Sequence, residues 1–319
     1  MRIASLAKLI GAKMLNEPLI KQIDGFSFTS SKVARQNAYF DIYGDLVSIH
    51  QAAQNGAYCI ISELDIIPFD NEIAFIKVDD LRLSIYRLMR YFATQKELKF
   101  AQISNLQLNI LKHINADFSV LCADLIQNFN QIQNASAKSL FFTNEPNLLE
   151  KITFCPLKIA PQNAKIIKQN SLFFSDFIFN NERFSLQFPN VFVNELCEIL
   201  GVLMEQNIAF RLKDFKDFAH FKALFVSTQN QPAPFGASAR AFICENDKSV
   251  FNTLCAKLKN QMLFCVPPNF KKHENTDYFS FSSLDDLKNL RNFTYSLVLC
   301  DYDELFKILS TRHQNELLF

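Results

Sequence analysis

Apolar residues recur at helical spacing at the start of the chain and then gather in short runs typical of strands. Ile3, Leu6 and Ile10 predict a helix that ends at Gly11, a residue suited to a left-handed helix cap. Asp79 or Asp80 is expected to cap a later helix whose apolar face begins at Leu81. The other elements expected in the first hundred residues are strands over 38–43, 58–62 and 73–78 and a helix over 46–55. Strands that alternate with helices predict a layered α/β domain.

The pattern is less regular between residues 101 and 190, where apolar and Asn/Gln-rich stretches alternate. Strands are expected there near 118–122, 139–143 and 171–179, followed by an amphipathic helix over 191–206. Regular order returns near the C-terminus, with strands expected over 241–244, 262–266 and 296–300 and helices over 247–258, 284–290 and 303–309. The predicted fold class is therefore α/β, divided into an N-terminal domain (1–98), a central domain (99–218) and a C-terminal domain (219–319).

Composition narrows the possible partners. The chain of 319 residues has 33 Lys and Arg against 32 Asp and Glu, a net charge of +1, which provides no general field for nucleic acid or an anionic membrane. Phe is common, at 34 residues, and clusters such as Phe173-Phe174 are interpreted as core or strand residues rather than as a base-stacking platform. We expect no nucleic-acid partner.

Cysteine and histidine give no sign of a metal site. None of the eight cysteines forms a Cys-x-x-Cys pair, and the five histidines lack zinc-binding spacing. Most cysteines lie in apolar runs, as Cys59 and Cys300 do, which favours free thiols in a reducing compartment. No apolar run approaches the ~20 residues of a membrane span. We expect a soluble cytoplasmic protein with no metal site, and the sequence offers no catalytic residues.

The N-terminal third carries an ordered series of short motifs. They are Leu6–Gly11, Asp24–Ser27, Ser30-Ser31-Lys32-Val33, Asn37–Asp41, Ala52–Ala57 and Ile76–Asp80. This order and spacing over about residues 1–100 resemble the first domain of Mur ligases, in particular of those that add D-alanyl-D-alanine to a UDP-muramoyl peptide.

The resemblance implies a uridine-nucleotide site in this domain. In the family, the domain holds the uridine-diphosphate end of the substrate, and the residues implied here are Thr29, Ser30, Ser31, Lys32 and Phe40. Ser31 matches the family's Asp-Ser-Arg motif, whereas Ser30 replaces its Asp. Lys32 replaces its Arg, which keeps the charge but loses a bidentate fork. The alternative interpretation is that 29–32 is a polar loop at a strand end.

A Mur ligase enters its central domain through a Gly-rich loop that ends in Gly-Lys-Thr or Gly-Lys-Ser. The matching stretch here, Lys99–Gln107, contains no glycine, and none occurs between Gly56 and Gly201. A phosphate-cradling loop needs glycines for its backbone amides, a Lys for charge and a hydroxyl for Mg²⁺. We therefore expect neither ATP nor Mg²⁺ as a cofactor.

The likeness is fainter beyond residue 100. Phe188–Asn194 resembles the family's His-Asn-x-x-Asn segment without its His, and Ala241–Asn246 resembles the start of the ligase C-terminal domain. The resemblance thus implies a Mur-ligase-like N-terminal α/β domain, a reduced central α/β domain without the phosphate loop, and a Rossmann-like C-terminal α/β domain.

Three functions remain open from the sequence. The first is a non-catalytic Mur ligase relative, a binding or regulatory protein of peptidoglycan precursor synthesis that binds a UDP-muramoyl compound or a cell-wall synthesis enzyme. The second is an active ATP-dependent amino-acid or peptide ligase with an atypical nucleotide site. The third is a protein-interaction scaffold without a small ligand, which a large exposed apolar patch would favour.

Overall fold

In a computed structural model the described residues are 1–168, 171–259, 261–271 and 277–311, and they form two compact units. Unit 1 consists of Met1–Ile103 and Asp117–Lys158, and unit 2 of Ser104–Ala116 and the described residues from Ile159 onward. The chain therefore leaves unit 1 after Ile103, returns at Asp117 and leaves it again after Lys158. The division into three sequence domains remains a prediction beside this packing.

A five-stranded sheet in the order β1-β5-β4-β3-β2 lies at the centre of the first hundred residues. Its strands are β1 (Lys13–Met14), β2 (Gly25–Ser27), β3 (Asn37–Phe40), β4 (Cys59–Ser62) and β5 (Ala74–Lys77). Strands β2 to β5 are parallel to their neighbours, and β1 runs antiparallel at the edge. Strand β3 ends at Phe40, three residues before the predicted end, because Asp41 begins a turn in which its carboxylate accepts the Gly44 N–H.

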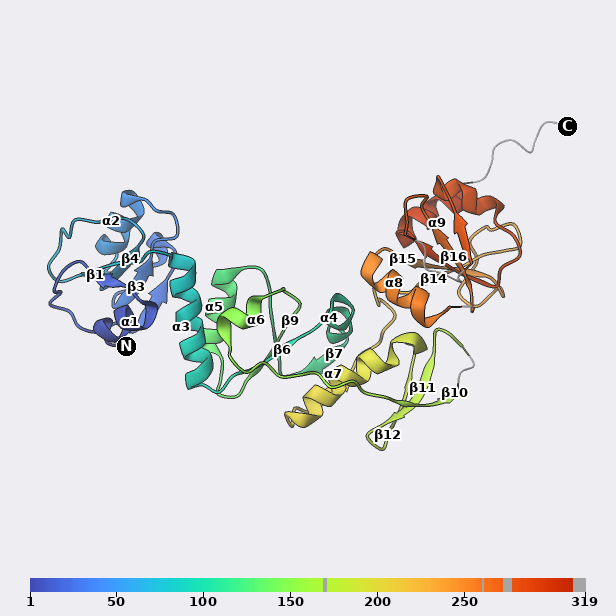
Figure 1. Ribbon diagram of the computed structural model, residues 1–319, viewed down its shortest axis with the longest axis horizontal. Helices are drawn as coiled ribbons and strands as arrows, with labels where there is room; N and C mark the ends of the chain where they lie inside the picture. The colour runs from blue at the N-terminus through green and yellow to red at the C-terminus, as the bar shows by residue number, and fades with distance from the viewer. Residues whose placement is uncertain (169–170, 260, 272–276, 312–319) are drawn as a thin grey trace. The chain divides into compact units, whose positions relative to one another are not determined.

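Helices cover both faces of this sheet. Helix α2 (Leu46–Gln54) packs on one face, and α1 (Ile3–Ile10) and α3 (Leu81–Gln95) pack on the other, as Figure 1 shows. The predicted ends are confirmed for two of these helices. Gly11 caps α1 with a φ of 70°, and the Asp80 carboxylate accepts the Leu83 N–H at the start of α3. Parallel strands covered on both faces read as continuous apolar runs, which is why β4 was visible in the sequence.

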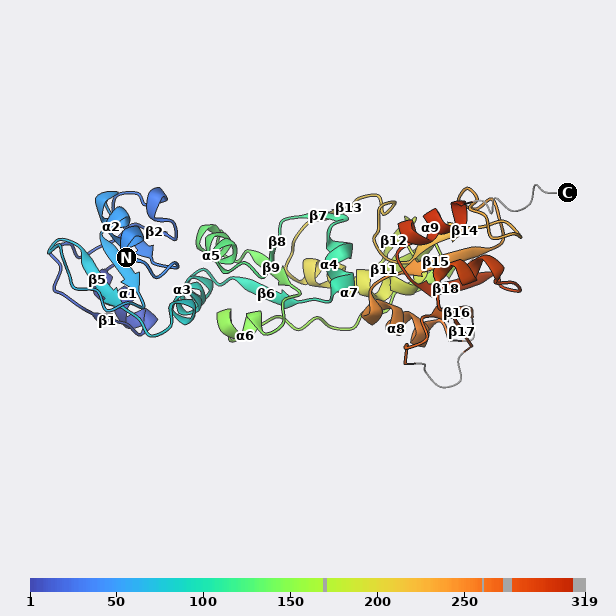
Figure 2. The same cartoon turned by 90° about the horizontal axis from the view of Figure 1, so that it is seen from above.

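A second, three-stranded parallel sheet completes unit 1 in the order β6-β9-β8. Its elements are β6 (Lys99–Gln102), β8 (Ser119–Leu121), α5 (Leu125–Asn134), β9 (Leu140–Thr143) and α6 (Leu148–Ile152). Figure 2 shows α5 and α6 on opposite sides of this sheet. Helix α3 contacts both α5 and α6, so a single apolar core runs from the first sheet to the second.

The centre of that core is aromatic. Phe129 of α5 is fully buried, and its ring lies 5.0 Å from that of Phe28 and 5.6 Å from that of Phe26, both edge to face. Phe40 stacks on Phe28 at 5.2 Å. These contacts explain part of the high Phe content as core packing, as the composition suggested.

The first part of unit 2 combines short paired strands with a long helix. Its elements are α4 (Asn105–Leu111), β7 (Ile114–Ala116), β10 (Lys165–Lys168), β11 (Ser175–Phe179), β12 (Glu182–Leu186), η2 (Asn190–Phe192), α7 (Val193–Glu205) and β13 (Phe210–Leu212). Strand β7 pairs with β13, and α4 packs on α7. Strands β11 and β12 are joined by Asn180 and Asn181, whose φ values of 48° and 65° suit a two-residue hairpin turn.

The last hundred residues form a five-stranded sheet in the order β14-β15-β18-β16-β17. Its elements are β14 (Lys222–Phe225), β15 (Ala241–Glu245), α8 (Lys248–Lys257), β16 (Leu263–Val266), β17 (Tyr278–Ser280), η3 (Leu284–Asn289), β18 (Tyr295–Leu299) and α9 (Tyr302–Ser310). All neighbours are parallel except β14. The helix predicted over 284–290 is a 3-10 helix, and the predicted α/β fold class is confirmed.

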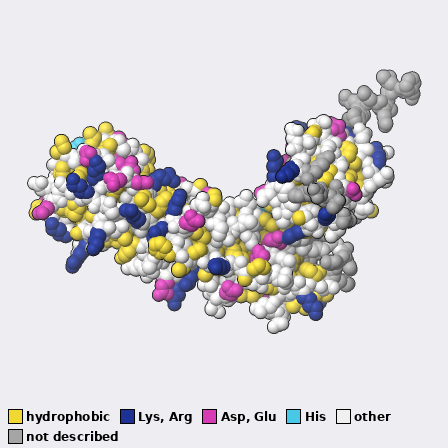
Figure 3. All heavy atoms as spheres, viewed as in Figure 1, with side chains coloured by type: hydrophobic (Ala, Val, Ile, Leu, Met, Phe, Trp, Pro, Cys, Tyr) yellow, Lys and Arg dark blue, Asp and Glu magenta, His cyan; other side chains and the backbone are white. Residues whose placement is uncertain are grey.

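Charged and apolar side chains interleave on the surface of unit 1 seen in Figure 3, in line with the nearly neutral net charge. Among the residues that the structure describes, no helix combines the length and apolar character that a bilayer span requires.

The aromatic core gives a first testable prediction. Replacing the fully buried Phe129 by Ala removes the ring shared by Phe26 and Phe28, and we expect it to cost ~3–5 kcal/mol of unfolding free energy. The matched control is Phe154→Ala, since that ring is 75% exposed and contacts Arg90; its cost should stay below ~1 kcal/mol. Urea unfolding measures both, and equal costs for the two variants would contradict the prediction.

Candidate functional site

The carboxyl edge of the first sheet is the natural place for a ligand in unit 1. Because β2 to β5 are parallel, the segments that follow them emerge along one edge. Ligands of open α/β sheets bind outside the carboxyl ends of the strands. The predicted segment Thr29–Lys32 follows β2 and therefore lies at this edge.

The structure holds this segment against α2. Residues Ser30–Lys32 form the 3-10 helix η1, in which the buried Ser30 hydroxyl donates to Gln51 Oε1 at 2.6 Å. The Asn55 amide donates to the Ser30 carbonyl at 2.9 Å. Thr29 is half-buried, whereas the side chains of Ser31 and Lys32 are exposed. Ser30 thus fixes the loop, and Ser31 and Lys32 are the members that can reach a ligand.

Phe40 lies apart from the other predicted residues. Its side chain is fully buried and stacks between Phe28 and the aromatic core around Phe129. The Phe40 ring therefore belongs to the core at the end of β3. The next residue, Asp41, is the first one after this strand to line the cavity at the carboxyl edge.

A cavity of about 600 Å³ opens in unit 1 and is lined by residues 41–44, 63–64, 81–82, 85 and 123–126. It collects three carboxylates, each bonded to neighbouring groups. Asp41 accepts the Ser62 hydroxyl at 2.8 Å and the Gly44 N–H at 3.0 Å. Glu63 accepts the Leu81 N–H at 2.6 Å, and Asp124 accepts two N–H groups at the start of α5. An ionised carboxylate has about four acceptor positions, so each retains capacity for a ligand hydroxyl.

Arg82 brings a positive charge to the same cavity. Its side chain is exposed on the first turn of α3, next to Leu81. The cavity is therefore polar and of mixed charge, with Tyr43 64% exposed at its side. None of these residues was predicted from the sequence to belong to a site. The available signal was that Asp41 and Glu63 directly follow the buried strands β3 and β4.

The corner formed by Ser104–Gln107 at the start of α4, in unit 2, falls in the stretch that the sequence matched to a phosphate loop. Ile103 and Ser104 alone connect the strand to the helix. The Ser104 hydroxyl accepts the Gln107 N–H at 3.2 Å, and the Gln107 side chain accepts the Ser104 N–H at 2.9 Å, which is a capping box. These two N–H groups are therefore satisfied within the chain.

A carboxylate also faces this corner. The buried Gln107 amide donates to Glu198 Oε2 of α7 at 2.7 Å. Burial raises the pKa of Glu198, and the nearby Glu195 adds to the rise, whereas Lys257 and the Gln107 bond oppose it. A phosphate binds at unsatisfied amides in a positive field. At this helix start the Ser104 and Gln107 N–H groups are bonded within the chain, and the Glu198 carboxylate lies beside Gln107.

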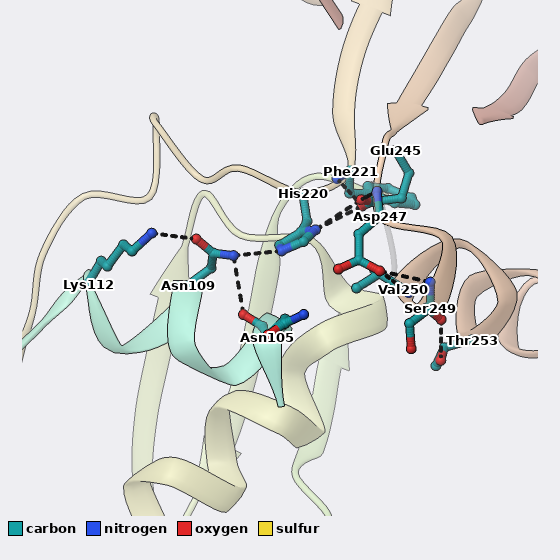
Figure 4. A network of polar contacts seen from close by, with 10 residues as sticks. All are labelled: Asn105, Asn109, Lys112, His220, Phe221, Glu245, Asp247, Ser249, Val250 and Thr253. Carbon is teal, nitrogen blue, oxygen red and sulfur yellow. Dashed lines mark hydrogen bonds and ion pairs between the residues drawn. The ribbon is translucent and has the colours of Figure 1, made fainter. Parts of the chain in front are cut away.

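Unit 2 contains a second polar network, drawn in Figure 4. His220, 5% exposed, places Nδ1 3.0 Å from Glu245 Oε1 and Nε2 2.8 Å from Asn109 Nδ2. Lys112 donates to Asn109 Oδ1, so the amide nitrogen of Asn109 faces His220. This arrangement assigns Nδ1–H as the donor to Glu245 and Nε2 as an acceptor. The His220 ring thereby bridges α4 and β15.

The other histidines lie apart from this network. His113 contacts the Asp214 carbonyl at 2.7 Å, and His50 packs against Phe69, while His273 and His313 lie outside the described residues. Within the described ranges, no group of three or more His, Cys, Asp or Glu side chains is arranged to hold a metal ion.

No protein-family model and no curated protein matches the sequence. Among solved structures, the chain is similar to MurF from Acinetobacter baumannii, with 11% identity, a TM-score of 0.48 and coverage of 97% of this chain and 99% of that one. It is also similar to MurF ligase from Thermotoga maritima in complex with ADP, with 11% identity, a TM-score of 0.46 and coverage of 89% and 97%. A UDP-N-acetylmuramoyl-L-alanyl-D-glutamate–2,6-diaminopimelate ligase gives 10% identity, a TM-score of 0.43 and coverage of 93% of both chains. Similarity at this level does not assign the chain to a family.

The corner at the start of α4 gives a pH-dependent prediction. Because burial raises the pKa of Glu198 above its ordinary value of 4.5, the folded state binds this proton more tightly than the unfolded chain does. The stability that Glu198 contributes is complete below that ordinary value and is lost as the pH rises through the folded-state pKa. Glu198→Gln keeps an acceptor for Gln107 and should therefore gain stability relative to the unmodified chain as the pH rises to neutrality.

The control for this experiment lies on the same helix. Glu205→Gln, exposed on the last turn of α7, should show no such pH-dependent gain. Thermal unfolding across the acid-to-neutral range measures the difference. A Glu198→Gln variant that is less stable than the unmodified chain at neutral pH would show that the Glu198 carboxylate stabilises the corner.

Proposed function

We propose that this chain is a non-catalytic, Mur-ligase-like binding or regulatory protein of peptidoglycan precursor synthesis, and that its N-terminal domain binds a UDP-muramoyl compound in the cytoplasm. The ordered motifs of residues 1–100 support the ligand class. The observation that carries the proposal is the capped start of α4 beside Glu198, in the stretch that matches the ATP loop of such a ligase.

The chemistry of that corner opposes ATP-dependent ligation at this position. A ligase loop presents several free amides and a Lys to the phosphates, with a hydroxyl on Mg²⁺. Here the Ser104 hydroxyl is an acceptor in a helix cap, Gln107 is buried, and Glu198 contributes negative charge. Bringing a triphosphate to this corner would require breaking the capping box next to a carboxylate.

The edge of the first sheet offers complementary groups for a nucleotide sugar. Ribose and sugar hydroxyls are donors that suit carboxylates such as Asp41, Glu63 and Asp124. The diphosphate needs cations, and the exposed Lys32 and Arg82 are the cations of this edge that we assign to it. Ser31 adds a neutral hydroxyl beside Lys32. In this proposal the cavity and the η1 loop share one extended ligand.

The experiment is a thermal-shift series with UDP, UDP-N-acetylmuramic acid, a UDP-muramoyl peptide and ATP–Mg²⁺. A ligand at 100 times its dissociation constant stabilises the fold by about 2.7 kcal/mol, which gives a clear shift. We expect shifts with the uridine compounds and none with ATP–Mg²⁺. A shift with ATP–Mg²⁺ would support the alternative of an atypical ligase, and no shift with any compound would leave a protein partner, such as a cell-wall synthesis enzyme, as the ligand.

Two variants localise the site. Lys32→Ala and Arg82→Ala should each weaken the uridine compounds about tenfold, because each removes one charge-assisted contact to the diphosphate. The matched control is Lys21→Ala, an exposed lysine that precedes β2 and so lies at the amino end of the sheet. Isothermal titration measures the three affinities. Equal affinities for all three variants would contradict this placement of the diphosphate.

A further inference from the structure

A second cavity, of about 380 Å³, lies within unit 2, and aromatic residues share its lining with charged and polar ones. Its rings are those of Phe173, Phe215, Phe218, Phe221 and Phe235. The ring centroid of Phe173 lies 5.9 Å from that of Phe221 and 5.7 Å from that of Phe235, and the Phe173 and Phe235 rings meet edge to face. This volume is within the range of small-molecule sites, and Phe235, which is 53% exposed, offers ring surface on which a further planar ring can pack.

The base of the cavity is held in an unusual backbone conformation. Phe221 has a φ of 57°, in the left-handed region that bulky side chains rarely adopt. Its N–H donates to Glu245 Oε2 at 3.3 Å, and the same carboxylate accepts His220 Nδ1–H. Strain of this kind persists where the surroundings impose it and is frequent at ligand sites. The buried His220–Glu245 pair thus fixes the wall that Phe221 presents.

The mouth of the cavity carries both signs of charge. Lys222 lies 5.7 Å from the ring of Tyr302, and Asp303 follows Tyr302 at the start of α9. Neither Lys222 nor Asp303 forms an ion pair with another residue in the described part of the chain. Phe235 is 53% exposed beside them, so part of one aromatic wall faces solvent. An ammonium beside Asp303 and a carboxylate beside Lys222 would complement these two charges.

We propose that this cavity binds a free aromatic α-amino acid. The ring packs on the exposed part of Phe235, which itself rests on the buried Phe173, and the zwitterionic head group lies between Lys222 and Asp303. Such a site is separate from the uridine site proposed in unit 1 and uses none of its residues. It would make the stability of unit 2 depend on the concentration of an amino acid.

Binding can be read directly because the chain contains no Trp. L-Tryptophan, excited beyond the tyrosine band, is then the sole indole in the sample. We expect its fluorescence anisotropy to rise on titration with the full-length protein. Phe235→Ala should weaken L-tryptophan about fivefold, as expected for the loss of one aromatic pair. The matched control is Phe69→Ala, a ring in unit 1 that is 44% exposed, and it should leave the affinity unchanged.

The head-group assignment has its own comparison. Lys222→Gln should weaken L-tryptophan but leave indole, which has no carboxylate, unaffected. N-acetyl-L-tryptophanamide carries neither charge and should bind more weakly than L-tryptophan. Equal binding of the two would overturn the free-amino-acid assignment in favour of an aromatic side chain within a peptide. No binding of L-tryptophan, or equal affinities for Phe235→Ala and the unmodified chain, would overturn the site itself; unchanged thermal midpoints of the variants establish that they are folded.

Discussion

Helix α3 is the element on which unit 1 depends. One of its faces packs with α1 against the five-stranded sheet, and it also contacts α5 and α6 of the three-stranded sheet. Apart from the antiparallel edge strand β1, both sheets are parallel, and a parallel sheet needs cover on each face. Because α3 contributes to the cover of both, the two sheets share one core that contains Phe28, Phe40 and Phe129. The cavity at the carboxyl edge is a consequence of this sharing, since the residues that follow β3 and those at the start of α5 line it together.

The sequence was most informative where a local signal and burial agree. Gly11 marked the end of α1, because a left-handed cap favours glycine at that one position. Asp80 marked the start of α3, because its carboxylate can accept a free N–H of the first turn. Helix α5 was not predicted, although Leu125, Phe129 and Ile132 follow helical spacing. Its Asn and Gln residues obscured the apolar pattern. One of them, Asn128, is buried because its side chain is fully bonded: its Oδ1 accepts the Cys122 N–H, and its amide nitrogen donates to the Cys122 carbonyl.

The site was predictable in part for the same reason. Residues 29–32 could be placed at a strand end from the chain order, and they lie at the carboxyl edge. The grouping of Asp41, Glu63, Arg82 and Asp124 depends on tertiary contacts between segments far apart in sequence, which no local pattern carries. At the start of α4, the missing glycines led to the prediction that no phosphate loop forms, which stays a prediction, whereas the capping box and the contact with Glu198 needed the structure. Phe221, with its left-handed backbone, had no sequence signal, because Gly or Asn is the residue normally found there.

The path of the chain between the two units bears on its synthesis. Residues 104–116 leave unit 1 early, yet their partners come late: α4 packs on α7, and β7 pairs with β13 at Phe210–Leu212. A ribosome delivers the chain from the N-terminus, so this segment is made before its partners and remains without them while residues 117–158 complete unit 1. During that interval an unpaired strand and the apolar side of α4 are exposed. The self-contained capping box of Ser104 and Gln107 uses residues already made, and so allows α4 to start before its partner helix exists.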